Sequence, residues 1–425
     1  MRQAGAMTTS RGAGHQALSR RLGLTDAVGI GLASMLGAGV FVVFAPAAAR
    51  AGSLLLLAVV LAGALAVVNA TSTARLAIRY PRAGGAYVYG RERLGMPWGH
   101  LAGWAFISGK IASCAAMALT IGVHVLPGWS KAVAILVVLV VLALNLQGIE
   151  RPARVARAIT LAVLVVVLTF VVVLLMSPPV TADAPPPTPP GSGGWWGVAQ
   201  AAGFMFFAFA GYARVATLGE EVVEPRRTIP RAVAICLGVV LGLYVLITVA
   251  LGRTLGAGWV AAREAPLAEA AEISAWPWLG PMLRIAAVLA AGGALLALTL
   301  GVSRTVLAMA RDRHLPPVLA RLEGPHRVPR RAEIVVAGFV IVMIVLVDLR
   351  GVIGFSSFCV LVYYAIANAS AWTLDDGWLG RAVAAVGFIG CLLVAVLLPW
   401  ESVLAGAVVL AIGAFIGWVR HTTRE

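Results

Sequence analysis

The sequence predicts an all-α membrane protein with twelve transmembrane helices, and two observations carry this prediction. Hydrophobic residues make up 60% of the 425 positions and charged residues only 12%, whereas about 25% of a soluble domain is charged. So few charges cannot cover a water-facing surface. The second observation is a series of apolar stretches of roughly 20 residues, each long enough to cross a hydrocarbon core about 30 Å thick.

Twelve such stretches follow one another along the chain, and most are separated by short polar turns. The segment 177–195 is rich in proline and glycine and is expected to be an extended external linker. The stretch 253–280 holds a short acidic helix candidate at 263–274, which is either a mobile cap on the outer face or a passive surface helix. The predicted spans lie near 25–48, 53–75, 98–125, 130–147, 157–176, 196–219, 229–252, 281–310, 332–349, 351–373, 379–398 and 402–419.

Positive charge alternates between the two sets of loops. One set carries clusters of arginine, for example Arg79, Arg226 and Arg330, whereas the other set has almost none. Because cytoplasmic loops hold the excess of Lys and Arg, both termini are expected in the cytoplasm, with 1–23 as a tail rather than a cleaved signal. The same bias accounts for the net charge of +15 without nucleic acid as a partner.

Enzyme, metal and channel functions find little support in the residues. The four cysteines all lie in apolar runs without CxxC spacing, so no disulfide, metal site or cofactor is expected. No predicted span carries paired carboxylates, a histidine cluster, or a nucleophile beside a base; His100 and His124 stand at opposite ends of the third span. A channel would need a polar stripe along several helices, and these are mostly Leu, Val and Ala.

Two spans are expected to be broken near their middle. The first contains Gly37 and Gly39, and the sixth contains Gly211 after the aromatic run 206–209. Glycine costs about 1 kcal/mol relative to alanine inside a helix. Small residues alone more often serve close helix packing, but the first and sixth spans correspond in a five-plus-five inverted repeat, where paired interruptions point to a transport site.

Such breaks suit one class of ligand. An unwound backbone at membrane depth is tolerated only where it lines a cavity in the protein. It exposes amides at one half-helix N-terminus and carbonyls at the opposing C-terminus, which match the carboxylate and the ammonium of an α-amino acid.

Five short motifs, in order along the chain, resemble the amino acid–polyamine–organocation (APC) superfamily of transporters, from the first span to at least the tenth. They are Gly37-Ala38-Gly39-Val40-Phe41, Tyr80-Pro81-Arg82-Ala83-Gly84-Gly85-Ala86-Tyr87, Phe209-Ala210-Gly211-Tyr212, Gly219-Glu220-Glu221 with Glu224-Pro225, and Ser303-Arg304 with Ala310-Arg311-Asp312.

The resemblance implies the leucine-transporter-like fold, with ten core helices and two peripheral ones. The implied organisation is a cytoplasmic tail (1–23), a first repeat (24–176), the external linker (177–195), a second repeat (196–373), two peripheral helices (374–419) and a cytoplasmic end (420–425).

The resemblance also implies a substrate site at the two breaks. The carboxylate is expected at the amides of Gly37, Ala38 and Gly39, and the ammonium at carbonyls near Met35 and in the turn 207–210. Phe209 or Tyr212 is either an outer lid or an aromatic packed in the bundle. The implied substrate-binding residues are Met35, Gly37, Ala38, Gly39, Phe207, Ala208, Phe209, Ala210, Gly211 and Tyr212.

The substrate expectation rests on a departure from the family pattern. Relatives that take cationic amino acids often have an acidic residue where this chain has Ala213, so neutral amino acids are the default. Arg214 either attracts acidic side chains or snorkels near the inner end of the helix. Together with Glu220 and Glu221 it is a candidate inner gate; a solvated charge cluster is the alternative.

Lys110 is the candidate coupling residue. It lies thirteen residues beyond Pro97, deep in the third span, where a charged side chain is costly and functional by default. Some sodium-independent relatives carry a lysine on span 5, but the equivalent position here is near Val163. Lys110 is either a proton carrier or fixed cation, or a structural lysine. Thr299 and Ser303 lie one turn apart on the eighth span, so a sodium site built from hydroxyls and carbonyls is an alternative.

The expected function is therefore secondary active transport of amino acids across the cytoplasmic membrane by alternating access. Proton coupling or exchange is expected, and sodium is not excluded. The alternatives are a polyamine or charged amino acid exchanger and, from another class, a non-transporting amino acid sensor. The lipid bilayer is the expected surrounding, and the oligomeric state stays open.

Overall fold

The computed structural model describes residues 22–80, 84–148, 153–178, 193–216, 222–323, 328–375 and 377–422. Regular structure in these ranges is helical, and the β-structure is limited to two isolated bridges. Eleven helical segments are long and apolar enough to cross a membrane. The all-helical membrane fold class is therefore as predicted.

Each predicted span coincides with a helical segment, with ends displaced by a few residues. The ninth, α15, is only 17 residues long and is not among the eleven candidates. In order, the segments are α1 (Leu24–Met35) with α2 (Gly39–Val42) and α3 (Phe44–Ala51), α4 (Leu55–Arg79), α6 (Met96–Val125), α7 (Ser130–Leu146), α8 (Ala153–Met176), α9 (Gly194–Phe209) with η3 (Ala210–Tyr212) and α10 (Ala213–Ala216), α11 (Pro225–Thr254), α14 (Leu279–Arg311), α15 (Arg330–Leu346), α16 (Leu349–Trp372), α17 (Gly377–Leu397) and α18 (Trp400–Thr422).

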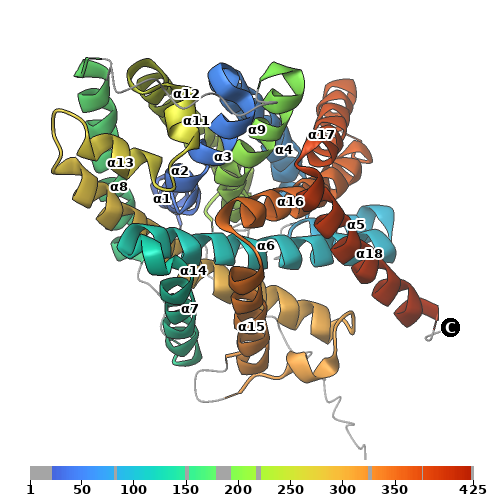
Figure 1. Cartoon of the computed structure of the whole chain (residues 1–425). Helices are drawn as coiled ribbons and strands as arrows, with labels where there is room; N and C mark the ends of the chain where they lie inside the picture. The colour runs from blue at the N-terminus through green and yellow to red at the C-terminus, as the bar shows by residue number, and fades with distance from the viewer. Residues whose placement is uncertain are drawn as a thin grey trace, which may run out of the picture.

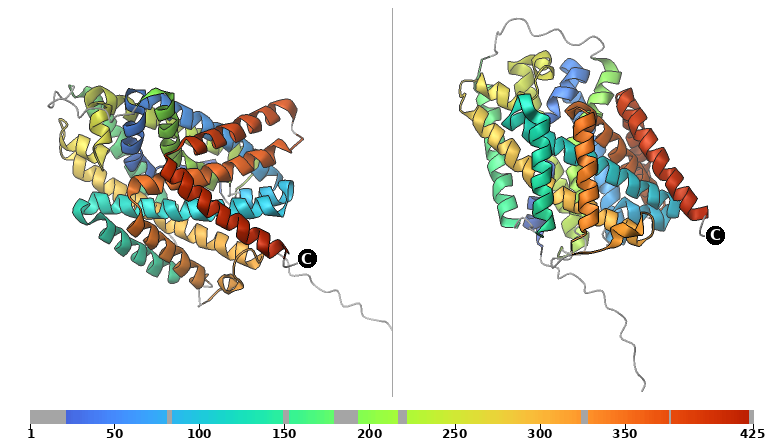
Figure 2. Two further views of the ribbon diagram at one scale, coloured as in Figure 1. Left: turned by 45° about the vertical axis from the view of Figure 1, so that its right-hand side comes forward. Right: turned by 60° about the horizontal axis from the view of Figure 1, so that its bottom comes forward.

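The helices form two packed groups. The first, which we call the bundle, comprises α1 to α4 and α9 to α11. The second, which we call the scaffold, comprises α6, α7, α14 and α15. Helix α6 crosses the molecule beside α16 in Figure 1, and α7 lies beside α15 in both views of Figure 2.

Contacts in the two halves of the chain correspond. Helix α4, the second span, packs on α11, the seventh; α6 packs on α14, and α7 on α15. The fifth span, α8, packs on α1, α11 and α14, whereas the tenth, α16, packs on α9, α4 and α6, which are their counterparts five spans away. The contacts of the fifth span thus correspond to those of the tenth.

Two short helical regions lie between the spans. Helix α5 (Ala86–Leu94) begins at Gly85, whose φ of 56° suits glycine. A Cβ atom there would lie 2.2 Å from the Tyr363 hydroxyl oxygen, and that hydroxyl accepts a hydrogen bond from the Ala86 amide at 2.9 Å. Glycine is therefore required where α5 meets α16.

The second region is α12 (Gly256–Ala261) and α13 (Pro266–Glu272), where one acidic helix was predicted. Most of α13 is buried, and it packs against α14 and α2. The predicted acidic segment is therefore packed against two other helices. The predicted linker 177–195 lies, except for its ends, outside the described residues.

Candidate functional site

The first span is interrupted at its glycine-rich motif. Helix α1 ends at Met35, α2 begins at Gly39, and residues 36–38 are not helical. The amide of Leu36 still bonds the Leu32 carbonyl at 2.8 Å. Among the described residues, neither the Gly37 nor the Ala38 amide donates a hydrogen bond. Buried amides without a partner are rare in folded proteins, so the break presents two free donors.

The sixth span is interrupted less severely than the unwound turn that the sequence predicts. Helix α9 ends at Phe209, and the chain passes through the 3₁₀ turn Ala210–Tyr212 into α10. A 3₁₀ turn inside an α-helix alters the hydrogen-bond ladder, and it often marks a hinge. The backbone is tightened here rather than opened.

The two interruptions lie against each other. A Cβ atom on Gly39 would lie 2.8 Å from the Cα of Ala208, and one on Gly37 would lie 2.9 Å from the Cβ of Ala294 on α14. A Cβ atom on Gly211 would lie 2.4 Å from the carbonyl oxygen of Ser34. The glycines therefore let the backbones of the two broken helices touch, and hold the first of them close to α14.

Carbonyls at the ends of α1 and α9 face tyrosine hydroxyls. The Tyr244 hydroxyl of α11 lies 3.3 Å from the Met35 carbonyl oxygen and 3.4 Å from that of Ala208. The hydroxyl has one proton, so it satisfies one of these carbonyls at a time. The Tyr364 hydroxyl of α16 donates to the Ala210 carbonyl at 3.5 Å.

The predicted substrate residues are brought together at these interruptions. Phe207 and Gly211 are partly exposed, and the other predicted residues are buried. Phe209 packs edge-on against Tyr244 with ring centroids 5.1 Å apart, and Tyr212 stacks on Tyr364 at 5.3 Å. Both candidate lid residues are thus packed aromatics of the bundle in this structure.

Lys110 lies fourteen residues into α6, about 21 Å from its start. Its side chain is partly buried and makes no hydrogen bond or ion pair with the residues that the structure describes. The Cys114 thiol, one turn further along α6, is its electrostatic neighbour.

The other candidate charges are placed only in part. Arg214 is exposed on α10. Glu220 and Glu221 lie outside the described residues, so the structure says nothing of the predicted inner gate.

Thr299 and Ser303, on which the sodium alternative rests, are hydrogen-bonded to side chains of other helices. Thr299 Oγ1 accepts a hydrogen bond from Asn145 Nδ2 at 2.9 Å, and Ser303 Oγ lies 2.5 Å from Glu333 Oε1. The sequence indicates neither partner, because Asn145 and Glu333 stand at span ends, where polar residues are ordinary. The sequence does not reveal that the ninth span packs against the fourth and the eighth.

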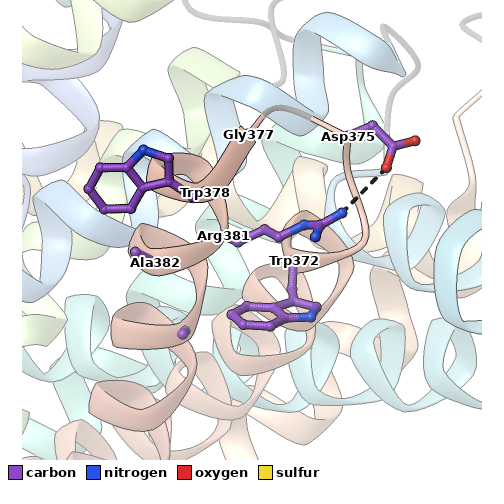
Figure 3. Close-up of a pocket in the computed structure, with 7 residues that line it drawn as sticks. Trp372, Asp375, Gly377, Trp378, Arg381 and Ala382 are labelled. Atoms are coloured by element: carbon purple, nitrogen blue, oxygen red, sulfur yellow. Dashed lines mark ion pairs between the residues drawn. The ribbon is translucent and has the colours of Figure 1, made fainter.

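An open groove lies elsewhere, at the turn between α16 and α17. It has a volume of about 630 Å³ and is lined by Trp372, Trp378 and the ion pair of Arg381 with Asp375 at 3.6 Å. Figure 3 shows these side chains around the turn. None of the predicted substrate residues lines it. Exposed tryptophans are typical of the membrane–water interface.

Comparisons with known proteins identify the family of this chain. The profile of the amino acid permease family matches residues 26–417. An uncharacterized transporter of Mycobacterium tuberculosis is 54% identical over 406 residues, which cover 95% of this chain and 92% of the relative. The branched-chain amino acid permease BcaP of Bacillus subtilis is 25% identical over 340 residues, 74% of this chain and 72% of the relative.

A plant relative is named for a different class of substrate. The vacuolar cationic amino acid transporter 2 of Arabidopsis thaliana is 28% identical over 346 residues, 76% of this chain and 54% of the relative. The profile match extends over nearly the whole chain and confirms the resemblance seen in its motifs. This chain belongs to the amino acid permease family and is a transporter rather than an enzyme.

Proposed function

We propose that this protein is a secondary active transporter that moves neutral amino acids across the cell membrane by alternating access, with both termini in the cytoplasm. The observation that carries the proposal is the pair of buried Gly37 and Ala38 amides without partners among the described residues. Hydrogen-bond donors of this kind, at the start of a half-helix, suit a carboxylate.

The ammonium group is assigned to the opposite side of the break. The carbonyls of Met35 and Ala208 share a single tyrosine proton from Tyr244. A substrate ammonium has three protons and satisfies both carbonyls at once, in place of the tyrosine hydroxyl. The arrangement therefore favours the two backbone groups common to all α-amino acids.

Neutral side chains are favoured because acidic residues are missing from both breaks. In 34–44 and 204–216 the charged residue is Arg214, which is exposed. The neighbouring position, Ala213, supplies no carboxylate for an arginine or lysine substrate. The name of the Bacillus relative agrees with a neutral substrate; the plant relative's name makes cationic amino acids the alternative to test.

Alternating access is assigned to movement of the bundle against the scaffold. The correspondence of contacts between residues 24–176 and 196–373 supports an inverted repeat, whose two halves change roles as the protein opens on either side. Helix α13 packs on α2 beside the first break and thus contributes to closing the outer side. Arg214, Glu220 and Glu221 are proposed to close the inner side.

Coupling to protons is assigned to Lys110. A charged side chain this deep in a span is costly to keep, and such residues are commonly parts of proton pathways. Proton release from Lys110 during the inward-facing part of the cycle would couple substrate entry to a proton gradient; exchange of amino acids is the alternative.

Thermal-shift measurements on detergent-purified protein with each of the twenty amino acids test the substrate class. A ligand at a hundred times its Kd stabilises the folded protein by about 2.7 kcal/mol. We expect stabilisation by aliphatic amino acids but not by their amides or decarboxylated amines, which lack the carboxylate. Stabilisation by arginine or lysine alone would replace the neutral substrate class with the cationic one.

A further inference from the structure

A buried polar cluster joins three scaffold helices away from the substrate site. We call it the Glu333 cluster: Asn145 of α7, Thr299 and Ser303 of α14, and Glu333 of α15. Glu333 is only 1% exposed and Asn145 2%. Burying a carboxylate is costly unless it is hydrogen-bonded and its charge is balanced, so the partners of Glu333 determine what it can do.

Each carboxyl oxygen of Glu333 has one neighbour. Oε1 lies 2.5 Å from Ser303 Oγ, and Oε2 lies 3.2 Å from Asn145 Nδ2. The same Asn145 nitrogen donates to Thr299 Oγ1 at 2.9 Å. The carboxyl group is thus held between α7 and α14 by two uncharged side chains.

The Ser303 hydroxyl can hydrogen-bond this carboxyl group in both of its protonation states. It has one proton but two acceptors in reach, Glu333 Oε1 at 2.5 Å and the Leu300 carbonyl at 3.0 Å. When Glu333 is ionised, Ser303 donates to it. When Glu333 is protonated, its hydroxyl donates to Ser303 Oγ, which turns its own proton to Leu300.

Asn145 offers a second pair of alternatives. Its Oδ1 is buried and has no hydrogen-bond partner in the part of the chain that is described. With Nδ2 toward Glu333, the amide donates to the ionised carboxylate. If the amide turns over, its oxygen instead accepts a hydrogen bond from Oε2 when that oxygen is protonated. In this second state Oδ1 of Asn145 has a hydrogen-bond partner. Its lack of a partner in the first state is explained if the protein adopts both.

The charges around Glu333 are few. The charged or titratable neighbours on other helices are Arg304 on α14 and, on α6, the Cys114 thiol, one turn from Lys110. Helix α7 contributes the uncharged Asn145, and the turn η4 (Pro317–Ala320) has no titratable side chain. On α15 itself, Arg331 pairs with Glu323 at 2.8 Å.

We propose that the Glu333 carboxyl group is a proton-binding site of the scaffold, which takes up a proton and releases it as the contacts of α7, α14 and α15 change. The step moves one proton between Glu333 and water, and no other bond changes. In its role in transport this inference rests on the proposed function and deepens it.

Helix α14 connects this proton site to the substrate site. Its Ala294 touches Gly37 at the first break, and Thr299 and Ser303 follow on the same helix, about 8 Å and 14 Å along its axis. A shift of α14 that accompanies substrate binding therefore also changes the hydrogen bonds of Glu333.

Infrared difference spectroscopy of the full chain in lipid tests proton binding directly. In a pH titration we expect the carbonyl band of a protonated carboxyl group in the wild type, its loss in Glu333→Gln, and its retention in Glu323→Gln, which removes a partly exposed carboxylate of the same segment. Ser303→Ala keeps the carboxyl group but removes the hydroxyl that serves both states, so its titration midpoint must move.

Three results would overturn the inference. They are a carboxyl band that persists in Glu333→Gln, a midpoint unchanged by Ser303→Ala, and a Glu333 band that responds to sodium at constant pH but not to pH. The last would make the cluster a sodium site. Ser303→Ala decides the matter if Glu333→Gln does not fold.

Transport measurements separate this inference from the proposed function. In proteoliposomes, Glu333→Gln is expected to keep amino acid counterflow and to lose the stimulation of uptake by an inward proton gradient. Full stimulation in Glu333→Gln would contradict a role of this proton in transport. If the wild type shows no counterflow of any amino acid, the proposed function fails, and the infrared titration still decides whether Glu333 binds a proton.

Discussion

Gly211 in the sixth span lies directly against the backbone of Ser34 in the first: a Cβ atom on Gly211 would lie 2.4 Å from the Ser34 carbonyl oxygen. Such a contact is not possible for a residue with a side chain unless one of the helices moves. Because Ser34 stands one residue before the end of α1, this contact fixes the position of the first break relative to the second.

Gly211→Ala is expected to abolish amino acid binding while leaving the protein folded. The added methyl group separates the two broken helices and moves the Met35 and Ala208 carbonyls apart. Overpacking of this kind typically costs about 1–3 kcal/mol. Loss of ligand-induced stabilisation in a thermal-shift assay measures the effect.

Gly242→Ala on α11 is the matched control, because a Cβ atom there would meet nothing within 4 Å. It is expected to bind as the wild type does and to be slightly more stable. Unchanged binding in Gly211→Ala would show that the contact between the breaks does not shape the site.

Tyr244→Phe tests whether the substrate ammonium uses the carbonyls of Met35 and Ala208. Without ligand, the variant is expected to be less stable by about 1 kcal/mol, because a buried hydrogen bond is lost. With a neutral amino acid, the stabilisation should be larger than in the wild type, since the ammonium no longer displaces a hydroxyl. Equal ligand-induced shifts in both proteins would place the ammonium elsewhere.

Lys110→Met is expected to make amino acid uptake independent of an imposed pH gradient, because the proposed proton carrier is gone. Lys131→Met is the control, as Lys131 is the chain's other lysine and its exposed side chain bonds the Val345 carbonyl at 2.9 Å. Uptake is measured in proteoliposomes at several internal and external pH values. A wild-type pH response in Lys110→Met would leave this residue a structural role.

Tyr87 on α5 is hydrogen-bonded to Asp312, the residue that follows the end of α14. Its hydroxyl donates to Asp312 Oδ2 at 2.6 Å, and Arg91 donates to the same oxygen at 3.0 Å. Burial and the hydrogen bond to the Asp312 carboxylate raise the pKa of the Tyr87 phenol. Because Asp312 is partly exposed, Tyr87→Phe is expected to cost about 1–2 kcal/mol.

The raised pKa fixes the sign of the pH dependence for Tyr87. The stabilisation is fully present below about pH 10, where the phenol titrates in an unfolded chain. It declines at higher pH, because the unfolded chain then loses the proton that the folded protein keeps. The Tm difference between wild type and Tyr87→Phe should be constant from pH 7 to 9. A difference that disappears in that range would contradict the assignment, and Tyr80→Phe provides a control.

Structural features that depend on local composition could be predicted from the sequence. Apolar stretches located the helical segments within a few residues, and Gly37 and Gly39 located the break in α1, because glycine weakens a helix wherever it stands. The degree of the second interruption was not predictable: Gly211 accommodates a contact with Ser34, and that contact comes from packing rather than from local propensity.

Contacts between residues far apart in the sequence could not be predicted. Glu333 stands at the start of a predicted span, where a residue at the membrane interface is expected. It is instead buried, because α7 and α14 cover it. The partners of Thr299 and Ser303, which are Asn145 and Glu333, could not be predicted from the sequence. Helix α5 depends on the Tyr363 hydroxyl, more than 270 residues away, which no local pattern reveals.

Counterflow of a radiolabelled neutral amino acid such as leucine, in liposomes that contain the purified protein, tests the central claim most directly. We predict saturable accumulation of label that leucine competes away and that Gly211→Ala lacks while Gly242→Ala retains it. Absence of counterflow for every one of the twenty amino acids, with the protein folded and inserted, would contradict it.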